Sequence, residues 1–286
     1  MEKHALASPV ITLTTDFGSR DPYVASMKGV IRTLCPNAAI EDLTHDIGPQ
    51  NITEAALFMA AAAPWFPEQT VHVVVVDPGV GGKRHAALAR AGGQFFIFPD
   101  NGVLTLLLRD TPLQEARIIQ NPAFTTRDVS HTFHGRDMFA PAAARIARGD
   151  ALTEAGPPLD KLVEIGIPDP VREENTVHGR VIHIDRFGNC ITNIPESMLD
   201  PSWVWEVAIT SHPPHVRRQS YAAVDEGEPL ALYSSTGRLE VAVRNGSAHA
   251  RLGLDIGTPI EVRGHPRAKK SPAETQPMKP LKETNS

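Results

Sequence analysis

Apolar residues in the first half of the chain recur with two different periods, which predicts short strands alternating with helices. Val10–Thr15 is a β-branched run, and residues 70–76 form a nearly continuous apolar run, as expected of a strand buried on both faces. Further expected elements are strands at 95–98 and 116–120 and helices at 102–109 and 137–148. This alternation predicts an α/β domain with a mostly parallel sheet flanked by helices.

Two helices in this half carry start signals. Residues 23–34 place apolar side chains at helical spacing, and Asp21 is the expected N-cap in front of a proline. Asn51 followed by Glu54 resembles a capping box, which predicts a helix over 52–63.

The character of the chain changes near residue 156, which predicts a two-domain protein. Residues 1–156 would form the α/β domain, and the proline-rich segment 157–175 would be a linker. Residues 176–264 predict a smaller, mostly antiparallel β domain, and the tail 265–286 has the composition of a disordered segment. The strands expected in the second domain are 179–184, 190–194, 204–210, 230–234, 239–243 and 259–263.

Composition narrows the class of protein. The 286 residues are 41% hydrophobic, which is enough to build a large core, and the net charge of −5 argues against a general binder of nucleic acid or anionic membranes. Cys35 and Cys190 fit neither a disulfide framework nor a zinc cluster. The sequence shows no secretory leader and no apolar run of the about 18 residues that a membrane helix needs, so we expect a cytoplasmic protein.

Three polar clusters of the first half follow strands, where an α/β sheet places its ligands. Asp16 closes the first strand and would either bind a ribose diol or cap its own loop. Asp77 ends the buried strand and is followed by a glycine-rich loop and Arg84; read alone, this pair is an ion pair more often than a site. The third cluster, His131, His134 and Asp137, has some likeness to a metal site, but its residues need not share a helix face.

In the second half, Asp185–Asn189 joins two expected strands. Phe187 offers an aromatic face, and Asn189 has the donor and acceptor that match an adenine edge. An ordinary hairpin turn would explain Gly188 and Asn189, but not a phenylalanine between polar neighbours.

Taken together, these segments resemble one family, the S-adenosyl-L-methionine (SAM) hydroxide adenosyltransferases, or SAM hydrolases, which are related to the fluorinating and chlorinating SAM enzymes. The resemblance spans roughly residues 9–263. It rests on five blocks in the family's order: Ile11–Gly29 (ITLTTDFGSRDPYVASMKG), Val73–Gly82 (VVVVDPGVGG), Phe98–Gly102 (FPDNG), Thr132–Pro141 (TFHGRDMFAP) and Ile184–Ile194 (IDRFGNCITNI).

The resemblance implies a homotrimer that binds SAM at its subunit interfaces, with SAM as substrate and no cofactor or metal. It places Asp16 on the ribose diol, Asp21 near the methionine end and Asp185 on the methionine ammonium. The other substrate-binding residues that it implies are Thr132 and Phe133 near the ribose and C5′, Phe187, Asn189 and Tyr221 around the adenine, and Ser235, Glu240 and Val243.

Within the superfamily, residue chemistry favours water as the nucleophile. The resemblance matches Asp77, Arg84 and His134 to the hydrolases' catalytic triad, whereas halogenating members carry tyrosine at the first and third of these positions. A halide needs desolvation and neutral donors, but water needs oriented acceptors. We expect hydrolysis of SAM to adenosine and methionine, with His134 as the candidate proton acceptor, Arg84 stabilising hydroxide and Asp77 orienting both.

Other functions stay open at this stage. One is a halogenase-type adenosyltransferase, and another is a SAM- or adenosine-binding protein without catalysis. The second is suggested by Arg244–Ala248, where relatives often carry Asn-x-Gly-Asn-Ala. A metallohydrolase built on the His131 cluster is a more distant alternative.

Overall fold

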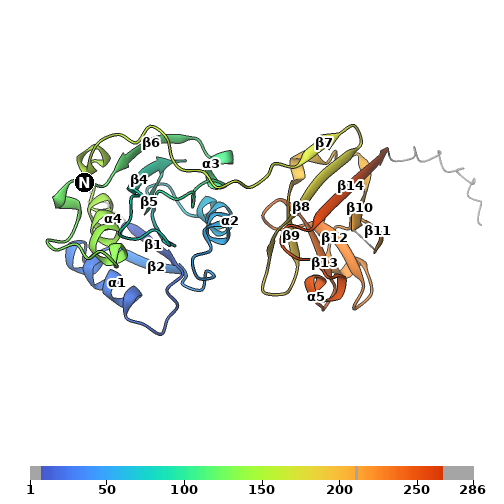
Figure 1. The fold of residues 1–286 in the computed structure, drawn as a ribbon, viewed down its shortest axis with the longest axis horizontal. Helices are drawn as coiled ribbons and strands as arrows, with labels where there is room; N and C mark the ends of the chain where they lie inside the picture. The colour runs from blue at the N-terminus through green and yellow to red at the C-terminus, as the bar shows by residue number, and fades with distance from the viewer. Residues whose placement is uncertain (1–7, 210–211, 267–286) are drawn as a thin grey trace, which may run out of the picture. The chain divides into compact units, whose positions relative to one another are not determined.

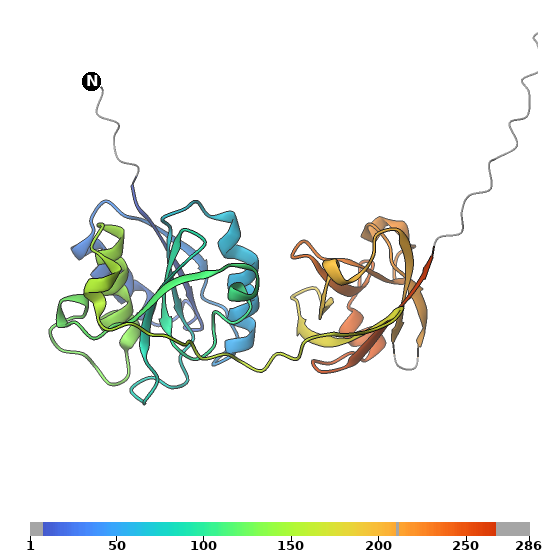
Figure 2. The same ribbon diagram turned by 90° about the horizontal axis from the view of Figure 1, so that it is seen from above.

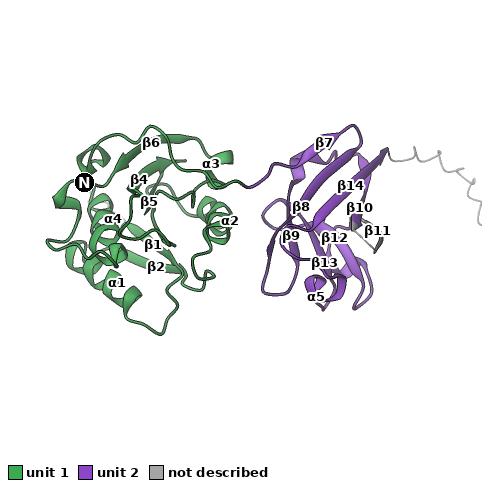
Figure 3. Ribbon diagram, viewed as in Figure 1, with its two compact units in different colours: residues 1–166 green, residues 167–286 purple. Residues whose placement is uncertain are grey.

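The fold is described here from a computed structural model, which covers residues 8–209 and 212–266. The chain divides into two compact units, residues 1–166 and 167–286 (Figure 3). The division falls inside the segment 157–175 that the sequence interpretation treats as a linker. His265 and Pro266 complete the last strand rather than beginning a tail; the rest of the expected tail lies outside the described residues.

Unit 1 is built on a six-stranded sheet with the order β2-β1-β3-β5-β4-β6 (Figure 1). The first four of these strands run parallel, and β4 is antiparallel to both of its neighbours. The strands are β1 (Val10–Thr15), β2 (Ala39–Thr44), β3 (Val71–Val75), β4 (Ala86–Ala91), β5 (Gln94–Pro99) and β6 (Leu113–Ile118).

Helices cover both faces of this sheet (Figures 1 and 2). One core lies between the sheet and helices α1 (Tyr23–Leu34) and α4 (Ala140–Ala147), and a second lies against α2 (Ile52–Ala62) and α3 (Leu107–Asp110). The central strand β3 contributes side chains to both cores. Val73 packs into the first core and Val74 into the second, and neither has exposed surface. The prediction of a strand buried on both faces is confirmed.

Of the two predicted helix N-caps, one is present in the structure and the other is not. Asn51 Oδ1 accepts a hydrogen bond of 3.0 Å from the Glu54 backbone N–H, so the predicted cap of α2 is present. The Glu54 carboxylate accepts from the Gly48 N–H at 3.0 Å, three residues before the position that a capping box would use. Asp21 as the N-cap of α1 is wrong, since Pro22 stands at that position and no side chain caps the helix.

The other differences in unit 1 have simple causes. Two strands are not predicted by the sequence pattern: β2, whose residues are partly buried or exposed, and β4, whose alanines have low strand propensity. Of the helix expected at 102–109, only the last residues belong to α3. Residues 101–106 form turns, and Gly102, the expected first helical residue, has a φ of +98°, outside the helical region. The helix expected at 137–148 begins earlier, with a π-helical turn at Gly135–Phe139 that continues into α4.

Unit 2 is an eight-stranded antiparallel sheet that curls toward a barrel. Its strand order is β11-β10-β14-β8-β9-β13-β12, with β7 paired to β8, and a bridge between Arg217 and Ala231 joins the two ends. Trp205 is among the largest fully buried side chains of its core. The elements are β7 (Val171–Glu173), β8 (Thr176–Ile184), β9 (Cys190–Pro195), β10 (Trp203–Ile209), β11 (His212–Val216), β12 (Pro229–Tyr233), β13 (Arg238–Val243), α5 (Ala248–Leu252) and β14 (Pro259–Pro266).

These two units confirm the predicted fold class, an α/β domain followed by an antiparallel β domain. All six strands expected in the second half are present, and β7 and β11 were not expected. Across the described part of the chain, no helix combines the length and apolarity needed to cross a membrane.

Candidate active site

A cavity of about 300 Å³ opens in unit 1 beyond the carboxyl ends of β1 and β3. It brings together five residues that the sequence analysis singled out, from three separate segments: Asp16, Asp77, Thr132, Phe133 and His134. A second cavity of about 320 Å³, covered by residues 160–164, contains none of the predicted site residues. The first cavity is therefore the candidate active site.

Asp77, Arg84 and His134 form a continuous hydrogen-bonded chain at this cavity. Arg84 Nε donates to both carboxylate oxygens of Asp77 at 3.0 Å, and its Nη2 also bonds Asp77. The same Nη2 donates to His134 Nδ1 at 2.7 Å. The Arg84 and Asp77 side chains are only 10% and 5% exposed, so the pair is shielded from solvent.

The bond to Arg84 fixes the protonation of His134. A guanidinium has donors and no acceptor, so Nδ1 must be the acceptor, and the imidazole is neutral with its hydrogen on Nε2. Burial and the nearby positive charge of Arg84 both lower the pKa of His134 below its ordinary value, which favours the same state. For His134 to take a proton at Nδ1, Arg84 would first have to release it.

The glycine-rich loop between Asp77 and Arg84 passes close to the segment before His134. Gly81 has a φ of +73°, and a Cβ atom there would lie 2.3 Å from the His131 carbonyl oxygen. Only glycine fits this crossing, so the loop glycines serve the packing of two site segments.

Around Asp16 the cavity wall is aromatic. Asp16 Oδ2 accepts a hydrogen bond from the Gln50 N–H at 2.8 Å. The rings of Phe17, Tyr23 and Phe133 lie within 5.1–5.9 Å of one another and line the same cavity. Phe17, Tyr23 and Gln50 also line the cavity but are not predicted from the sequence, because spacing alone does not separate an aromatic or polar residue that lines a cavity from one that does not. Asp21 is exposed and does not line the cavity.

A second group of predicted residues gathers in unit 2 at the β8–β9 turn. Asp185 Oδ1 accepts from the backbone N–H groups of Phe187 and Asn189 at 2.9 Å, and Oδ2 accepts from Asn189 Nδ2 at 3.0 Å. Phe187 is left 76% exposed. One of the two Asn189 amide hydrogens is thus used within the turn, which leaves the other hydrogen and the amide oxygen to contact a ligand.

Tyr221 and Glu240 adjoin this turn. The Tyr221 hydroxyl donates to Glu240 Oε1 at 2.5 Å, and Glu240 is only 3% exposed on β13. Burial, with the negative charge of Asp185, raises the pKa of Glu240. Val243 ends the same strand and is buried, whereas Ser235 lies exposed in the turn before it. The structure thus gathers Asp185, Asn189, Tyr221 and Glu240 beside this turn.

His131, His134 and Asp137, considered as a possible metal site, are not grouped as metal ligands in the structure. Asp137 turns to Arg136 and to the Ser130 N–H, and His134 turns to Arg84. Within the described ranges, no three His, Cys, Asp or Glu side chains are grouped so that they could hold a metal ion.

Comparison with known proteins agrees with this geometry. Residues 11–156 match the family model of the SAM hydroxide adenosyltransferase N-terminal domain, and residues 179–261 match that of the C-terminal domain. The chain belongs to the SAM hydroxide adenosyltransferase family, as the sequence resemblance indicated.

Individual relatives extend over both units. The chain is 38% identical to a Thermus thermophilus protein and 36% identical to one from Salinispora tropica, each named (R)-S-adenosyl-L-methionine hydrolase; each alignment covers 89% of this chain and at least 98% of the relative. A Nocardia brasiliensis fluorinase is 28% identical over 89% of this chain and 97% of its own. A solved Thermotoga maritima structure, titled as an uncharacterized conserved protein, superposes with a TM-score of 0.82 at 36% identity, covering 88% of this chain and 99% of that one.

Proposed function

We propose that this protein is an enzyme that hydrolyses SAM to adenosine and L-methionine by displacement at C5′. The observation that carries the proposal is the partly buried, hydrogen-bonded Asp77–Arg84–His134 chain at a cavity that Asp16 also lines. Membership of the family and the names of the hydrolase relatives support the same reaction. The enzyme would be cytoplasmic, in keeping with the free cysteines Cys35 and Cys190.

In the proposed mechanism, Asp16 holds the ribose and the Thr132–Phe133 wall limits its movement, so that C5′ faces the triad. Water attacks C5′ in line with the C5′–S bond, and the sulfonium leaves as the neutral thioether of methionine. The leaving group therefore needs no proton.

The proton that must be removed is on the attacking oxygen. Once the C–O bond forms, that oxygen is an alkyl-oxonium, so a weak base is sufficient. His134 Nδ1 is occupied by Arg84, which leads us to propose the Asp77 carboxylate as the acceptor instead of His134. Arg84 would hold the carboxylate in place. The Nε2–H of His134 would donate a hydrogen bond to the water oxygen and so orient it.

The remainder of the substrate would be bound by the unit 2 residues. Asp185 would attract the methionine ammonium, and Phe187, Asn189 and Tyr221 would frame the adenine, with Ser235, Glu240 and Val243 beside them. Asp21 would stay near the methionine end. In the homotrimer that the family resemblance implies, these residues would come from the neighbouring subunit. SAM is then the substrate, and no cofactor or metal takes part.

A halogenase is the competing enzyme class. The Asp77–Arg84–His134 chain argues against it, because a halide has no proton to lose and needs no carboxylate acceptor beside it, whereas water does.

The test is incubation of purified protein with SAM, with and without chloride, followed by mass spectrometry of the products. Adenosine and methionine at both salt conditions support the proposal. A chlorinated adenosine would favour the halogenase, and unchanged SAM would favour a protein that only binds.

A further inference from the structure

Asp137 is a buried carboxylate that the proposed reaction does not use. Its side chain is 2% exposed, and it lies in the π-helical turn directly after His134. Burial alone would oppose ionisation, but hydrogen bonds from Arg136 and from the Ser130 backbone outweigh it, and the pKa of Asp137 lies below the ordinary value. Asp137 is thus an ionised group held inside the fold.

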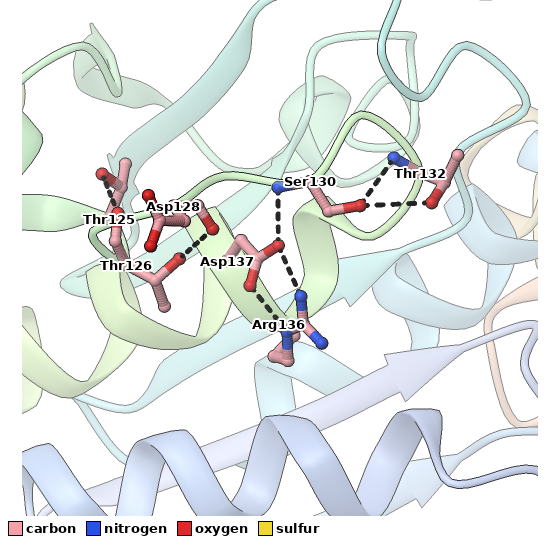
Figure 4. Close-up of polar contacts among 7 residues, drawn as sticks. All are labelled: Thr125, Thr126, Asp128, Ser130, Thr132, Arg136 and Asp137. Atoms are coloured by element: carbon pink, nitrogen blue, oxygen red, sulfur yellow. Dashed lines mark hydrogen bonds and ion pairs between the residues drawn. The ribbon is translucent and has the colours of Figure 1, made fainter.

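One set of contacts runs from Asp137 to Thr132. Asp137 Oδ2 accepts from the Ser130 N–H at 2.8 Å (Figure 4). The Ser130 hydroxyl then contacts Thr132 twice, at 3.2 Å from the Thr132 hydroxyl and at 3.2 Å from its N–H. Thr132 lines the candidate active site.

A second set of contacts runs from Asp137 to Phe133. Arg136 donates to Asp137 through Nε at 2.6 Å and through Nη2 at 2.9 Å, a two-point contact that fixes the guanidinium plane. That guanidinium lies over the Phe133 ring, with its carbon 5.2 Å from the ring centroid. Phe133 also lines the cavity.

We infer that Asp137 is a positioning residue that sets Thr132 and Phe133 on the cavity wall. It does so through Ser130 on one side and Arg136 on the other. The inference rests on the proposed function, in which these two residues limit the movement of the ribose and C5′. A displacement of about 1 Å near reacting atoms can cost about 10²-fold in rate, so Asp137 would act on the chemical step without touching substrate.

The chain contains a matched control for this arrangement. Arg145 donates to Asp150 at 2.8 Å and lies 5.5 Å from the Phe124 ring centroid, so it repeats the Asp–Arg–Phe contact. Phe124, however, is fully buried in the core and lines no part of the candidate active site. Loss of Asp150 therefore perturbs a similar contact away from the cavity.

The experiment compares Asp137→Ala and Asp137→Asn with Asp150→Ala, each checked for cooperative thermal unfolding. The asparagine variant keeps the shape and an acceptor for Ser130 but loses the charge that binds Arg136. We expect kcat with SAM to fall about 10²-fold in Asp137→Ala and less in Asp137→Asn, with KM changed under about threefold, while Asp150→Ala keeps the parent kcat. Amide hydrogen exchange over residues 126–134 should accelerate only in the Asp137 variants.

Parent kcat in a folded Asp137→Ala protein, or an equal loss in Asp150→Ala, would overturn the positioning role. If the parent protein itself does not turn over SAM, the proposed function fails instead. Amide exchange then decides the positioning role by itself: unchanged exchange at 126–134 in Asp137→Ala overturns it, and selective acceleration supports it.

Discussion

Arg84 uses one nitrogen, Nη2, to bond both the Asp77 carboxylate and Nδ1 of His134, the latter at 2.7 Å. Three side chains that lie up to 57 positions apart, from Asp77 to His134, are thereby fixed with respect to one another. Because the guanidinium can only donate, the link defines His134 as neutral and as a donor through Nε2. The proposed roles of Asp77 as proton acceptor and His134 as donor both depend on this bond.

The first prediction concerns the triad. Asp77→Ala, Arg84→Ala and His134→Ala should each lower kcat by at least about 10²-fold, the usual loss for a positioned acid–base or charge-stabilising group. Glu115→Ala is the control, since Glu115 pairs with Arg117 on β6 and lies outside the cavity. Steady-state rates near the parent value in any two triad variants would contradict the assignment.

The second prediction concerns pH. His134 must be neutral to accept from Arg84, and its pKa lies below the ordinary 6.5, so the neutral form persists as the pH falls through 6.5. We expect kcat to stay level from about pH 8 to 6.5 and to decline only at more acidic pH. The decline would follow protonation of His134 Nδ1, which breaks its hydrogen bond with Arg84.

The matched variant is His134→Asn, which removes the titrating group and leaves an amide oxygen for Arg84. It should be slower than the parent, and the acid decline due to His134 should be absent from its profile. An identical acid decline in His134→Asn would show that another group is responsible.

Much of this site follows from strand ends that the sequence marks clearly. Asp16 and Asp77 come directly after apolar runs, and parallel neighbouring strands bring such positions to one edge of a sheet. The hydrophobic pattern alone therefore predicts that Asp16 and Asp77 lie at one cavity. It does not predict the link from Arg84 to His134, because that link depends on how two loops cross at Gly81.

Other features depend on tertiary contacts that no local pattern records. The β4 strand is alanine-rich and forms because β5 and β6 flank it on both sides. Asp137 was considered only as part of a possible metal cluster, since nothing in the sequence shows that its neighbour Arg136 turns back onto it. The prediction of Asp21 as the N-cap of α1 is wrong for a similar reason, because a suitable residue type does not guarantee the geometry of a cap.

The third prediction concerns adenine binding in unit 2. Tyr221→Ala should weaken adenosine binding about tenfold or more, because base–aromatic stacking is worth about 1–3 kcal/mol. Asn189→Ala should also weaken it, because the amide that would hydrogen-bond the adenine edge is lost. In both variants kcat at saturating SAM should change less. Tyr221→Phe is the matched control: it keeps the ring and loses only the hydroxyl that donates to Glu240. Calorimetric titration with adenosine measures the effect, and parent affinity in Tyr221→Ala would rule out stacking.

The fourth prediction concerns the shared site of the proposed trimer. If each site takes its triad from one subunit and Asp185 from the next, mixing inactive His134→Ala with inactive Asp185→Ala protein should restore part of the activity after subunit exchange. Differently tagged subunits, recovered together, establish that exchange took place. A mixture no more active than its components after exchange, or a monomer by light scattering, would contradict the shared site.

The most direct test of the central claim is the origin of the oxygen in the product. Purified protein is incubated with SAM in H₂¹⁸O, and the products are analysed by mass spectrometry with fragmentation of the nucleoside. Attack of water at C5′ predicts adenosine carrying one ¹⁸O at the 5′-hydroxyl, together with unlabelled methionine. Unlabelled adenosine, or a nucleoside product other than adenosine, would contradict hydrolysis at C5′.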